Sequence, residues 1–361
     1  MSKCPTSAVN TISLTRLCYA AMCVLAIGMN LLPVFLTIIR EDYALSGILL
    51  SDEALGRIAA CPFIGLVFAC FFTGPLADRF GAKIFCLVGN VCSFCGLILC
   101  AFASSVTTLS FALVILGLGS GMLDMVLSPV IGALNTDNRS GSMNFLHSMY
   151  CAGAVFTTLV VQFGLGWATS CLLLAGPPII LFVLFSMQGF PSITEAGTTY
   201  VPMRNLIKQR WFLVALAAIF LGGSAEMGLA QWLPTYCETT LNYPHWFSGF
   251  ALTLFSVAMA LGRIGIGYVG KRVSPFDVLI VSCVVSFFLF IMASFLPQHF
   301  ALIAAILVGL TGSPMWPTVM AVTADEFPGG GATMYAVCLD LFSISFHALM
   351  LPLEGLASLR V

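Results

Sequence analysis

The chain has 361 residues, of which 60% are hydrophobic and 8% are charged, and its 14 basic and 15 acidic residues give a net charge of −1. A water-soluble protein of this length carries far more charge on its surface, and the balance of charge excludes the broad basic surface of a nucleic-acid-binding protein. We therefore expect a protein that is embedded in a lipid bilayer and has no nucleic-acid partner.

Long uncharged runs predict transmembrane helices along the chain. A helix needs about 20 apolar residues to cross a bilayer core of about 30 Å. The longer runs hold two helices each, separated by turn-like residues such as Ser104 and Ser105. The sequence thus predicts an all-α polytopic membrane protein. Its eleven predicted spans are 16–39, 53–73, 84–103, 107–133, 143–167, 170–190, 211–236, 246–269, 275–296, 299–323 and 331–355.

Residues 191–210 form the one sizeable hydrophilic break between the predicted spans. Proline, glycine, threonine and three basic residues in this stretch are typical of a linker. We expect an N-terminal six-helix bundle over residues 1–190, a cytoplasmic linker over 191–210 and a C-terminal bundle of five helices over 211–361.

The basic residues predict the orientation of the chain. With the N-terminus in the cytoplasm, eleven basic residues fall on the cytoplasmic side and three on the opposite side. Cytoplasmic loops of membrane proteins carry such an excess of lysine and arginine. We expect a multi-pass protein of a plasma membrane or inner membrane, with a cytoplasmic N-terminus.

Two sequence matches indicate that the halves are repeats. GPLADRF at 74–80 is echoed by GYVGKRV at 267–273, an offset of 193 residues, and GLGSGMLD at 117 by GLTGSPMW at 309, an offset of 192. Parallel halves of this kind are a known transporter design. By the same offset the span 170–190 should recur after Val361, so we expect that a twelfth span has been lost by truncation. A natural eleven-span variant is the alternative.

The 14 cysteines do not predict disulfides or a metal site. Most of them lie inside apolar spans, where cysteine acts as a small hydrophobic residue. Cys92 and Cys95 have the CxxC spacing of redox and metal motifs, but they lie in mid-span without histidine or acidic neighbours. We expect no metal and no cofactor.

The stretch GPLADRFGAK, which begins at Gly74, concentrates charge between two apolar runs. Gly74 and Gly81 permit a tight cytoplasmic turn and a close approach of helices. Asp78, beside Arg79, is able to accept hydrogen bonds from the N-terminus of a neighbouring helix. Breaking and remaking such a contact would gate the cytoplasmic side. The alternative is a basic anchor that only fixes topology, and we assign that role to Lys83.

The second copy of this stretch keeps Gly267 and Arg272 but has Lys271 at the position of Asp78. We include Gly267 and Arg272 among the gating residues. Because the acid is missing, we expect the contact in the second half to be lost or different.

GPLADRFGAK resembles the signature loop between helices 2 and 3 of the major facilitator superfamily, and the resemblance extends over the whole chain. Three further stretches are similar to the fucose-permease-like branch of sugar:proton symporters: SGSMNFLHSMYCAGA at 140–154, GSAEMGLAQWLPTY at 223–236 and SPMWPTVMAVTADEFPGGGATMYA at 313–336. The resemblance implies two six-helix bundles that rock around a site near the membrane midplane. It also implies a monosaccharide substrate moved with a proton.

One departure from that branch concerns the first span. Fucose-permease-like symporters can carry an acid a few positions after an asparagine, whereas here Asn30 is followed by no acid until Glu41 and Asp42. Proton coupling would then depend on Asp124 and Glu226.

Three acids lie within predicted spans, where an ionisable group is costly and by default functional. Asp124 shares a helix face with Gly121 and Ser128. Glu226 follows two glycines that would allow a bend. Asp340 lies in the last predicted span. We interpret all three as proton-coupling candidates, and the alternatives are an interhelical hydrogen bond for Asp124 and a hydrated position near the outer end for Glu226.

Sugars present C–H faces and hydroxyl rims, so they are bound by aromatic rings beside amide and carboxylate groups. Seven polar and aromatic residues of the spans supply such groups. They are Asn30, Asn144, His147, Gln162, Gln231, Trp232 and Trp316. For each of them, a satisfied polar contact between helices is the alternative.

The sequence thus predicts a secondary active transporter, expected as a monomer, for a small polar solute and a proton. A drug-like or organic-anion substrate is the first alternative, which a cation in the cavity would favour. The spans offer only Arg263, near a cytoplasmic end, and this position argues against the organic anion. A membrane enzyme is disfavoured because neither HExxH nor GxSxG occurs. A truncated, non-transporting remnant is the last alternative.

Overall fold

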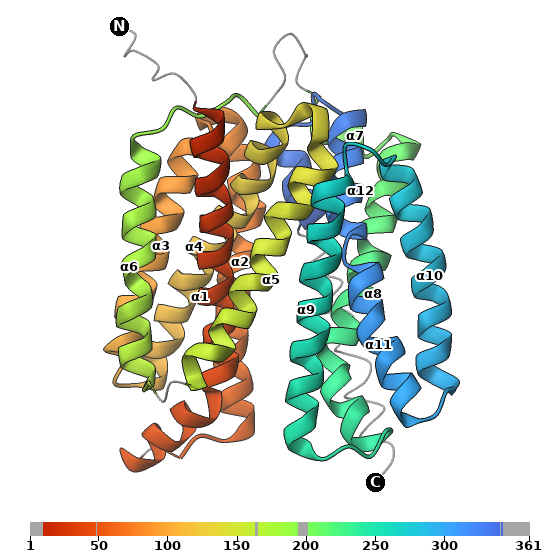
Figure 1. Cartoon of the computed structure of the whole chain (residues 1–361). Helices are drawn as coiled ribbons and strands as arrows, with labels where there is room; N and C mark the ends of the chain where they lie inside the picture. The colour runs from red at the N-terminus through yellow and green to blue at the C-terminus, as the bar shows by residue number, and fades with distance from the viewer. Residues whose placement is uncertain (1–9, 48, 163–164, 194–200, 340, 342–361) are drawn as a thin grey trace, which may run out of the picture. The chain divides into compact units, whose positions relative to one another are not determined.

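The computed structural model describes residues 10–47, 49–162, 165–193, 201–339 and 341. Within these ranges the chain forms helices and no strand (Figure 1). The helices are α1 (Thr11–Leu45), α2 (Asp52–Phe80), α3 (Ala82–Ala101), α4 (Val106–Leu134), α5 (Arg139–Gln162), α6 (Trp167–Ser186), α7 (Met203–Leu206), α8 (Arg210–Thr239), α9 (His245–Val269), α10 (Pro275–Phe295), α11 (Gln298–Gly312) and α12 (Met315–Glu326), with a short 3-10 helix at Thr136–Asn138.

The described residues have the fold of an all-α polytopic membrane protein, as the sequence predicts. It contains nine stretches of helix that are long and apolar enough to cross a membrane. The 24-residue α5 is not among them, and the side chains at its C-terminal end, 158–162, lie outside the described residues. Residues 331–339 are also helical. Most of the predicted span 331–355 lies outside the described residues.

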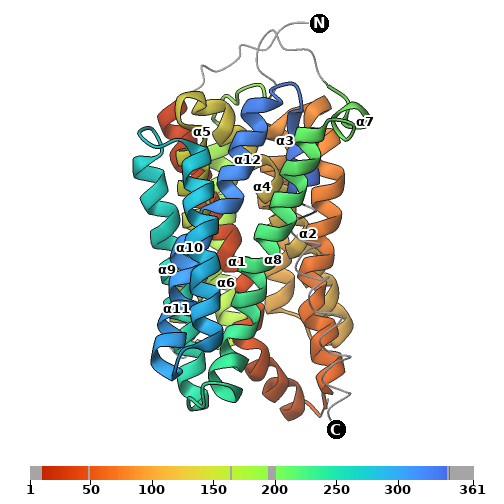
Figure 2. The same cartoon turned by 90° about the vertical axis from the view of Figure 1, so that its right-hand side faces the viewer.

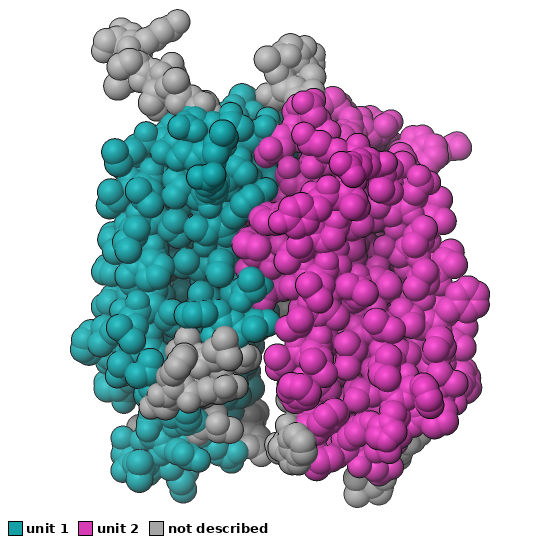
Figure 3. All heavy atoms as spheres, in the orientation of Figure 1, with its two compact units in different colours: residues 1–134, 152–197, 331–336 teal, residues 135–151, 198–330, 337–361 magenta. Residues whose placement is uncertain are grey.

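The chain divides into two compact units (Figure 3). Unit 1 comprises residues 1–134, 152–197 and 331–336, and unit 2 comprises 135–151, 198–330 and 337–361. The units therefore exchange segments: the first half of α5 belongs to unit 2, and the start of the helical segment 331–339 belongs to unit 1. The predicted bundle boundaries at 190 and 211 stay a prediction.

In unit 1, α4 packs closely against α2 and α3 through small residues. A Cβ atom added to Gly117 would collide with the backbone of Pro62 on α2. A Cβ atom added to Gly96 on α3 would lie 2.7 Å from the backbone nitrogen of Leu116 on α4. Small residues let helix backbones approach in this way in membranes. The stretch GLGSG at 117–121 thus serves the packing of α4 against its neighbours.

Unit 2 is built on a hydrophobic cluster from α8, α9, α10 and α11 that includes Leu233, Phe255, Leu289 and Ala305. The helix α12 lies beside α8, as Figure 2 shows. The two glycines of α8, Gly222 and Gly223, produce no break, because α8 is one continuous helix from Arg210 to Thr239. The expectation of a bend at these glycines stays a prediction.

The predicted span 299–323 is interrupted in the structure. α11 ends at Gly312, a turn covers Ser313 and Pro314, and α12 begins at Met315. In an α-helix each carbonyl accepts from the N–H four residues later, and proline has no N–H. Pro317 therefore leaves the Ser313 carbonyl without its helical donor, and that carbonyl is available to another partner.

Candidate functional site

A buried ion pair joins α8 and α9 inside unit 2. Arg263 Nη2 lies 2.5 Å from Glu226 Oε1, and each side chain is only 4% exposed. Both charges have thus left water, which is costly unless the pair is well hydrogen-bonded. Glu226 is buried and paired, so the alternative of a hydrated position is wrong.

Arg263 uses its remaining donors on three further partners. Its Nε donates to the carbonyl oxygen of Ser313 at 3.0 Å, the carbonyl that Pro317 leaves free. Its Nη1 donates to the carbonyl oxygen of His147 at 3.4 Å and contacts Cys151 Sγ at 3.3 Å. One guanidinium therefore connects α5, α8, α9 and the turn between α11 and α12.

Residues of α5 and α12 meet beside this pair. The rings of His147 and Trp316 lie edge to face, with centroids 5.0 Å apart. One turn earlier on α5, Asn144 Nδ2 donates to the carbonyl oxygen of Ser140 at 3.0 Å and to Thr318 Oγ1 at 2.9 Å. Two predicted site residues, His147 and Glu226, thus contact Arg263. Trp316 packs against the His147 ring, and Asn144 lies one turn away on α5.

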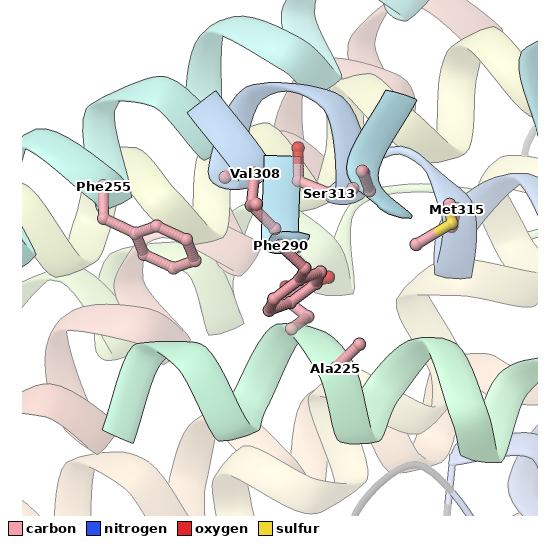
Figure 4. Close-up of a pocket in the computed structure, with 10 residues that line it drawn as sticks. Ala225, Phe255, Phe290, Val308, Ser313 and Met315 are labelled. Carbon is pink, nitrogen blue, oxygen red and sulfur yellow. The ribbon is translucent and has the colours of Figure 1, made fainter. Parts of the chain in front are cut away.

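A small pocket opens beside Glu226 (Figure 4). Its lining residues come from α8 to α12 and are Ala225, Glu226, Phe255, Ser286, Phe290, Val308, Gly309, Gly312, Ser313 and Met315. The lining is apolar except for the carboxylate of Glu226 and two serines. The enclosed space has room for about one water molecule. It is too small for a monosaccharide.

Asp124, Asn30 and Trp232 are the other predicted site residues whose side chains the structure describes. Asp124 lies half-buried on α4 in unit 1, and the described residues give it no hydrogen bond or ion pair. Asn30 on α1 donates from Nδ2 to the carbonyl oxygen of Ala26 at 2.8 Å. Trp232 is 38% exposed on α8.

Three other predicted residues cannot be placed. The side chains of Gln162 and Gln231, and the whole of Asp340, lie outside the described residues.

The stretch GPLADRFGAK is not the loop that its composition predicts. α2 continues through it to Phe80, so Gly74 lies in the helix, and only Gly81, with φ of 83°, makes the turn into α3. Gly74 instead allows a close approach: an added Cβ would lie 2.5 Å from Ala336 Cβ and 3.2 Å from the Ala332 carbonyl oxygen. The helix thus extends past the apolar run and brings charge to its end.

Asp78 caps the helical segment 331–339 within unit 1. Its carboxylate accepts from the backbone N–H of Ala332 at 2.5 Å and of Thr333 at 3.0 Å, and from the Thr333 hydroxyl. Gly331 precedes them with φ of 60°, a conformation that favours glycine. This contact with a helix N-terminus is the one that the sequence predicts for Asp78, and its gating role stays a prediction.

The neighbouring charges act differently from Asp78. Lys83 Nζ donates to the carbonyl oxygens of Ser186 at 2.8 Å and Gln188 at 2.7 Å, so it caps the end of α6. Arg79 is exposed, and its guanidinium carbon lies 5.2 Å from the ring centroid of Phe80.

GYVGKRV at 267–273, the second copy of this stretch, approaches α5 closely at Gly267. A Cβ added to Gly267 would lie 3.1 Å from Phe145 on α5, while Arg272 is exposed. The offset of 193 residues that relates Gly74 to Gly267 also relates Arg139 to Ala332. The two glycines thus pack against corresponding helices, but in unit 2 Arg139 pairs with Asp325 at the end of α12.

Sequence reasoning missed Arg263 and the Arg139–Asp325 pair as site residues. Arg263 was treated as a residue near a helix end. It lies six positions before the end of the predicted span 246–269, and a charge at that depth was the available signal. The Arg139–Asp325 pair joins residues 186 positions apart, and no local pattern predicts it.

Replacing Asp78 with alanine is expected to lower the free energy of unfolding by about 1–2 kcal/mol, because three donors at a helix N-terminus lose their acceptor. Thermal unfolding in detergent measures this change. Arg79→Ala is the control, since this neighbouring side chain is exposed, and it is expected to change stability by no more than about 0.5 kcal/mol. Equal unfolding temperatures for the two variants would contradict the capping role.

Comparison with known proteins gives similarities to transporters. The model of the Major Facilitator Superfamily matches residues 18–345. A solved structure of a variant of the fucose:proton symporter FucP from E. coli has a TM-score of 0.78 and 18% identity, covering 96% of this chain and 92% of that chain. At this identity the likeness concerns the fold.

Two curated relatives are similar in sequence. The chromaffin granule amine transporter of Rattus norvegicus is 25% identical over 241 residues, which cover 65% of this chain and 44% of the relative. The 4-hydroxybenzoate transporter PcaK of Pseudomonas putida is 26% identical over 276 residues, which cover 63% of this chain and 60% of the relative. The chain thus spans less than two thirds of the length of each.

Proposed function

The chain belongs to the Major Facilitator Superfamily, and from this premise we propose that it moves a small polar solute together with a proton by alternating access. It is an integral, multi-pass membrane transporter of that superfamily. The proton, the solute, a monomeric state and a cytoplasmic N-terminus in a plasma or inner membrane belong to the proposal.

The observation that supports proton coupling is the burial of Glu226 against Arg263. An ionisable group this deep in a membrane protein is by default part of an ion or proton path. When Glu226 takes up a proton it loses its charge and its ionic attraction to Arg263, and at most a weaker hydrogen bond from Nη2 to the neutral carboxyl is left. Because Arg263 also binds α5 and the turn between α11 and α12, this single proton changes the contacts of four elements.

Two contacts are proposed to gate the cytoplasmic ends of the helices. One is the capping of residues 331–339 by Asp78, and the other is the pairing of Arg139 with Asp325. Each joins a residue before the predicted linker to one after it. If the two sequence halves rock, both contacts have to break and re-form, so their strength sets the balance between the two conformations.

A monosaccharide, which the resemblance to fucose-permease-like symporters implies, is the first candidate solute. Asn144, His147 and Trp316 support it, since they combine an amide, an imidazole and an aromatic face on α5 and α12. The names of the relatives do not decide the matter, because one is named for amines and the other for 4-hydroxybenzoate.

Glu226→Gln is expected to abolish solute accumulation driven by a pH gradient in proteoliposomes, because glutamine cannot carry the proton. Exchange of labelled for unlabelled solute without a gradient should persist in this variant. The matched control is Asp277→Asn, which changes an exposed carboxylate at the start of α10 and should leave accumulation intact. If Glu226→Gln accumulated solute at the native level under a pH gradient, Glu226 would not be the residue that carries the proton.

A further inference from the structure

We propose that the solute of this site is a small organic anion with a flat apolar part, whose carboxylate replaces Glu226 on Arg263 when Glu226 is protonated. The inference rests on the proposed proton-coupled transport and names its substrate class. The anion takes the place of the monosaccharide that is the first candidate above, because neither a neutral sugar nor an amine brings a negative charge to Arg263.

The charge of Arg263 carries the first step. A guanidinium stays protonated in proteins, so Arg263 keeps its charge whatever Glu226 does. Its side chain is 4% exposed, and Glu226 is its ion-pair partner within the described part of unit 2. A buried cation that loses its counter-charge is strongly destabilised. Protonation of Glu226 therefore creates a demand for another negative group at Nη2.

Only an anion meets this demand. A sugar brings no charge, and an amine brings a second positive charge to a cation. A carboxylate matches the fork of a guanidinium and forms two parallel hydrogen bonds with it. Among the described residues, the other titratable groups beside the pair are His147 and Cys151 on α5. Arg263 Nη1 contacts the backbone carbonyl oxygen of His147 and the Sγ of Cys151. A neutral imidazole and a neutral thiol carry no negative charge, so neither residue replaces Glu226 as the partner of Arg263.

The pocket beside Glu226 gives the displaced side chain a place to go. It lies among α8 to α12 and has room for about one water molecule, which suits a carboxyl group and not a whole solute. Ser286 and Ser313 line it. Their hydroxyls already bond Thr311 Oγ1 and the Met259 carbonyl oxygen, but each hydroxyl oxygen has a lone pair that accepts from the O–H of a neutral carboxyl. The pocket thus receives Glu226 while the solute occupies Arg263.

The flat apolar part follows from the aromatic neighbours of the pair. His147, whose carbonyl binds Arg263, also places its ring against Trp316. The counter-charge for a ring-bearing carboxylate, Arg263, and the aromatic rings of His147 and Trp316 are therefore close together, because His147 contacts both of the others. One proton on Glu226 accompanies one anion on Arg263, so the exchange is balanced in charge.

Benzoate binding to the purified full chain in detergent, measured by calorimetry over a series of pH values, tests the proposal. Benzamide is the neutral control of the same shape. Because binding takes up one proton, benzoate affinity should rise by about tenfold for each pH unit that the pH falls, while benzamide should not bind. In Glu226→Gln, benzoate should bind with an affinity that no longer depends on pH.

The double variant Glu226→Gln/Arg263→Gln removes both charges and should lose benzoate binding while keeping the native elution profile. Should Glu226→Gln not fold, the pH dependence of the native chain and the benzamide control still decide. Benzoate binding that is unchanged in the double variant, or independent of pH in the native chain, would overturn the proposal.

Uptake measurements distinguish a failure of the anion inference from a failure of the proposed proton-coupled transport. If a pH gradient drives uptake of a labelled hexose while benzoate neither binds nor competes, the anion inference fails and proton-coupled transport stands. If a pH gradient drives uptake of neither benzoate nor the hexose, the proposed function fails with it.

Discussion

Replacing Arg263 with methionine is expected to lower the free energy of unfolding by about 3–5 kcal/mol, the usual cost of removing one partner of a buried ion pair. The cost arises because Glu226 keeps a charge that is 4% exposed and has lost its partner. The carbonyls of Ser313 and His147 lose a donor at the same time. Thermal unfolding of the purified variant in detergent measures the change.

The double variant Glu226→Met/Arg263→Met separates charge from packing. Apolar residues of similar size in place of both charges are often neutral or stabilising, so the double variant should recover most of the stability that Arg263→Met loses. Arg272→Met controls for loss of an arginine, since this side chain is exposed on the loop after α9. If the double variant were as unstable as the single one, the hydrogen bonds to the two carbonyls would outweigh the ion pair.

If the double variant behaves as expected, an apolar pair stabilises the fold as much as Glu226 and Arg263 do, and stability then does not explain why the charges are present. The surrounding sequence is arranged to accept them: Pro317 frees the Ser313 carbonyl for Nε, and α5 presents the His147 carbonyl to Nη1. A charged pair with little stability gain and several dedicated partners is typical of a functional site.

The fold was predictable because the bilayer dictates the length of each apolar run. The predicted spans 53–73 and 275–296, for example, correspond to α2 and α10. The predicted helix bounds are wrong where a helix does not match the length of its apolar run. α2 runs beyond its apolar stretch to Phe80, and the span 299–323 breaks at Pro314, although the spacing of Pro314 and Pro317 was visible in the sequence.

The candidate site was predictable only in part. Glu226 is evident as an acid in an apolar run, and the contact of Asp78 follows from the affinity of a carboxylate for a helix N-terminus. The partners were not evident, because Arg263 meets Glu226 across 37 positions and Asp78 meets Ala332 across 254. Pairings over such separations depend on which helices pack together, and the hydrophobic pattern of one sequence does not specify this.

Gly74→Leu is expected to separate the helical segment 331–339 from α2. Even the first carbon of the new side chain would lie 2.5 Å from Ala336 Cβ and 3.2 Å from the backbone of Thr333. Overpacking of this kind costs about 1–3 kcal/mol, and relief is available if the segment moves away from Asp78. The amides of Ala332 and Thr333, which Asp78 protects, should then exchange hydrogen about tenfold to a hundredfold faster.

Gly56→Leu is the matched control, because Gly56 lies on the same helix and an added Cβ would meet nothing within 4 Å. It should leave the exchange of Ala332 and Thr333 unchanged, and equal exchange in both variants would show that Gly74 does not hold the segment. The gating role adds a second readout. If the contact between α2 and residues 331–336 closes the cytoplasmic side, weakening it shifts the conformational balance. Gly74→Leu, and not Gly56→Leu, should then change the rate of solute exchange in proteoliposomes.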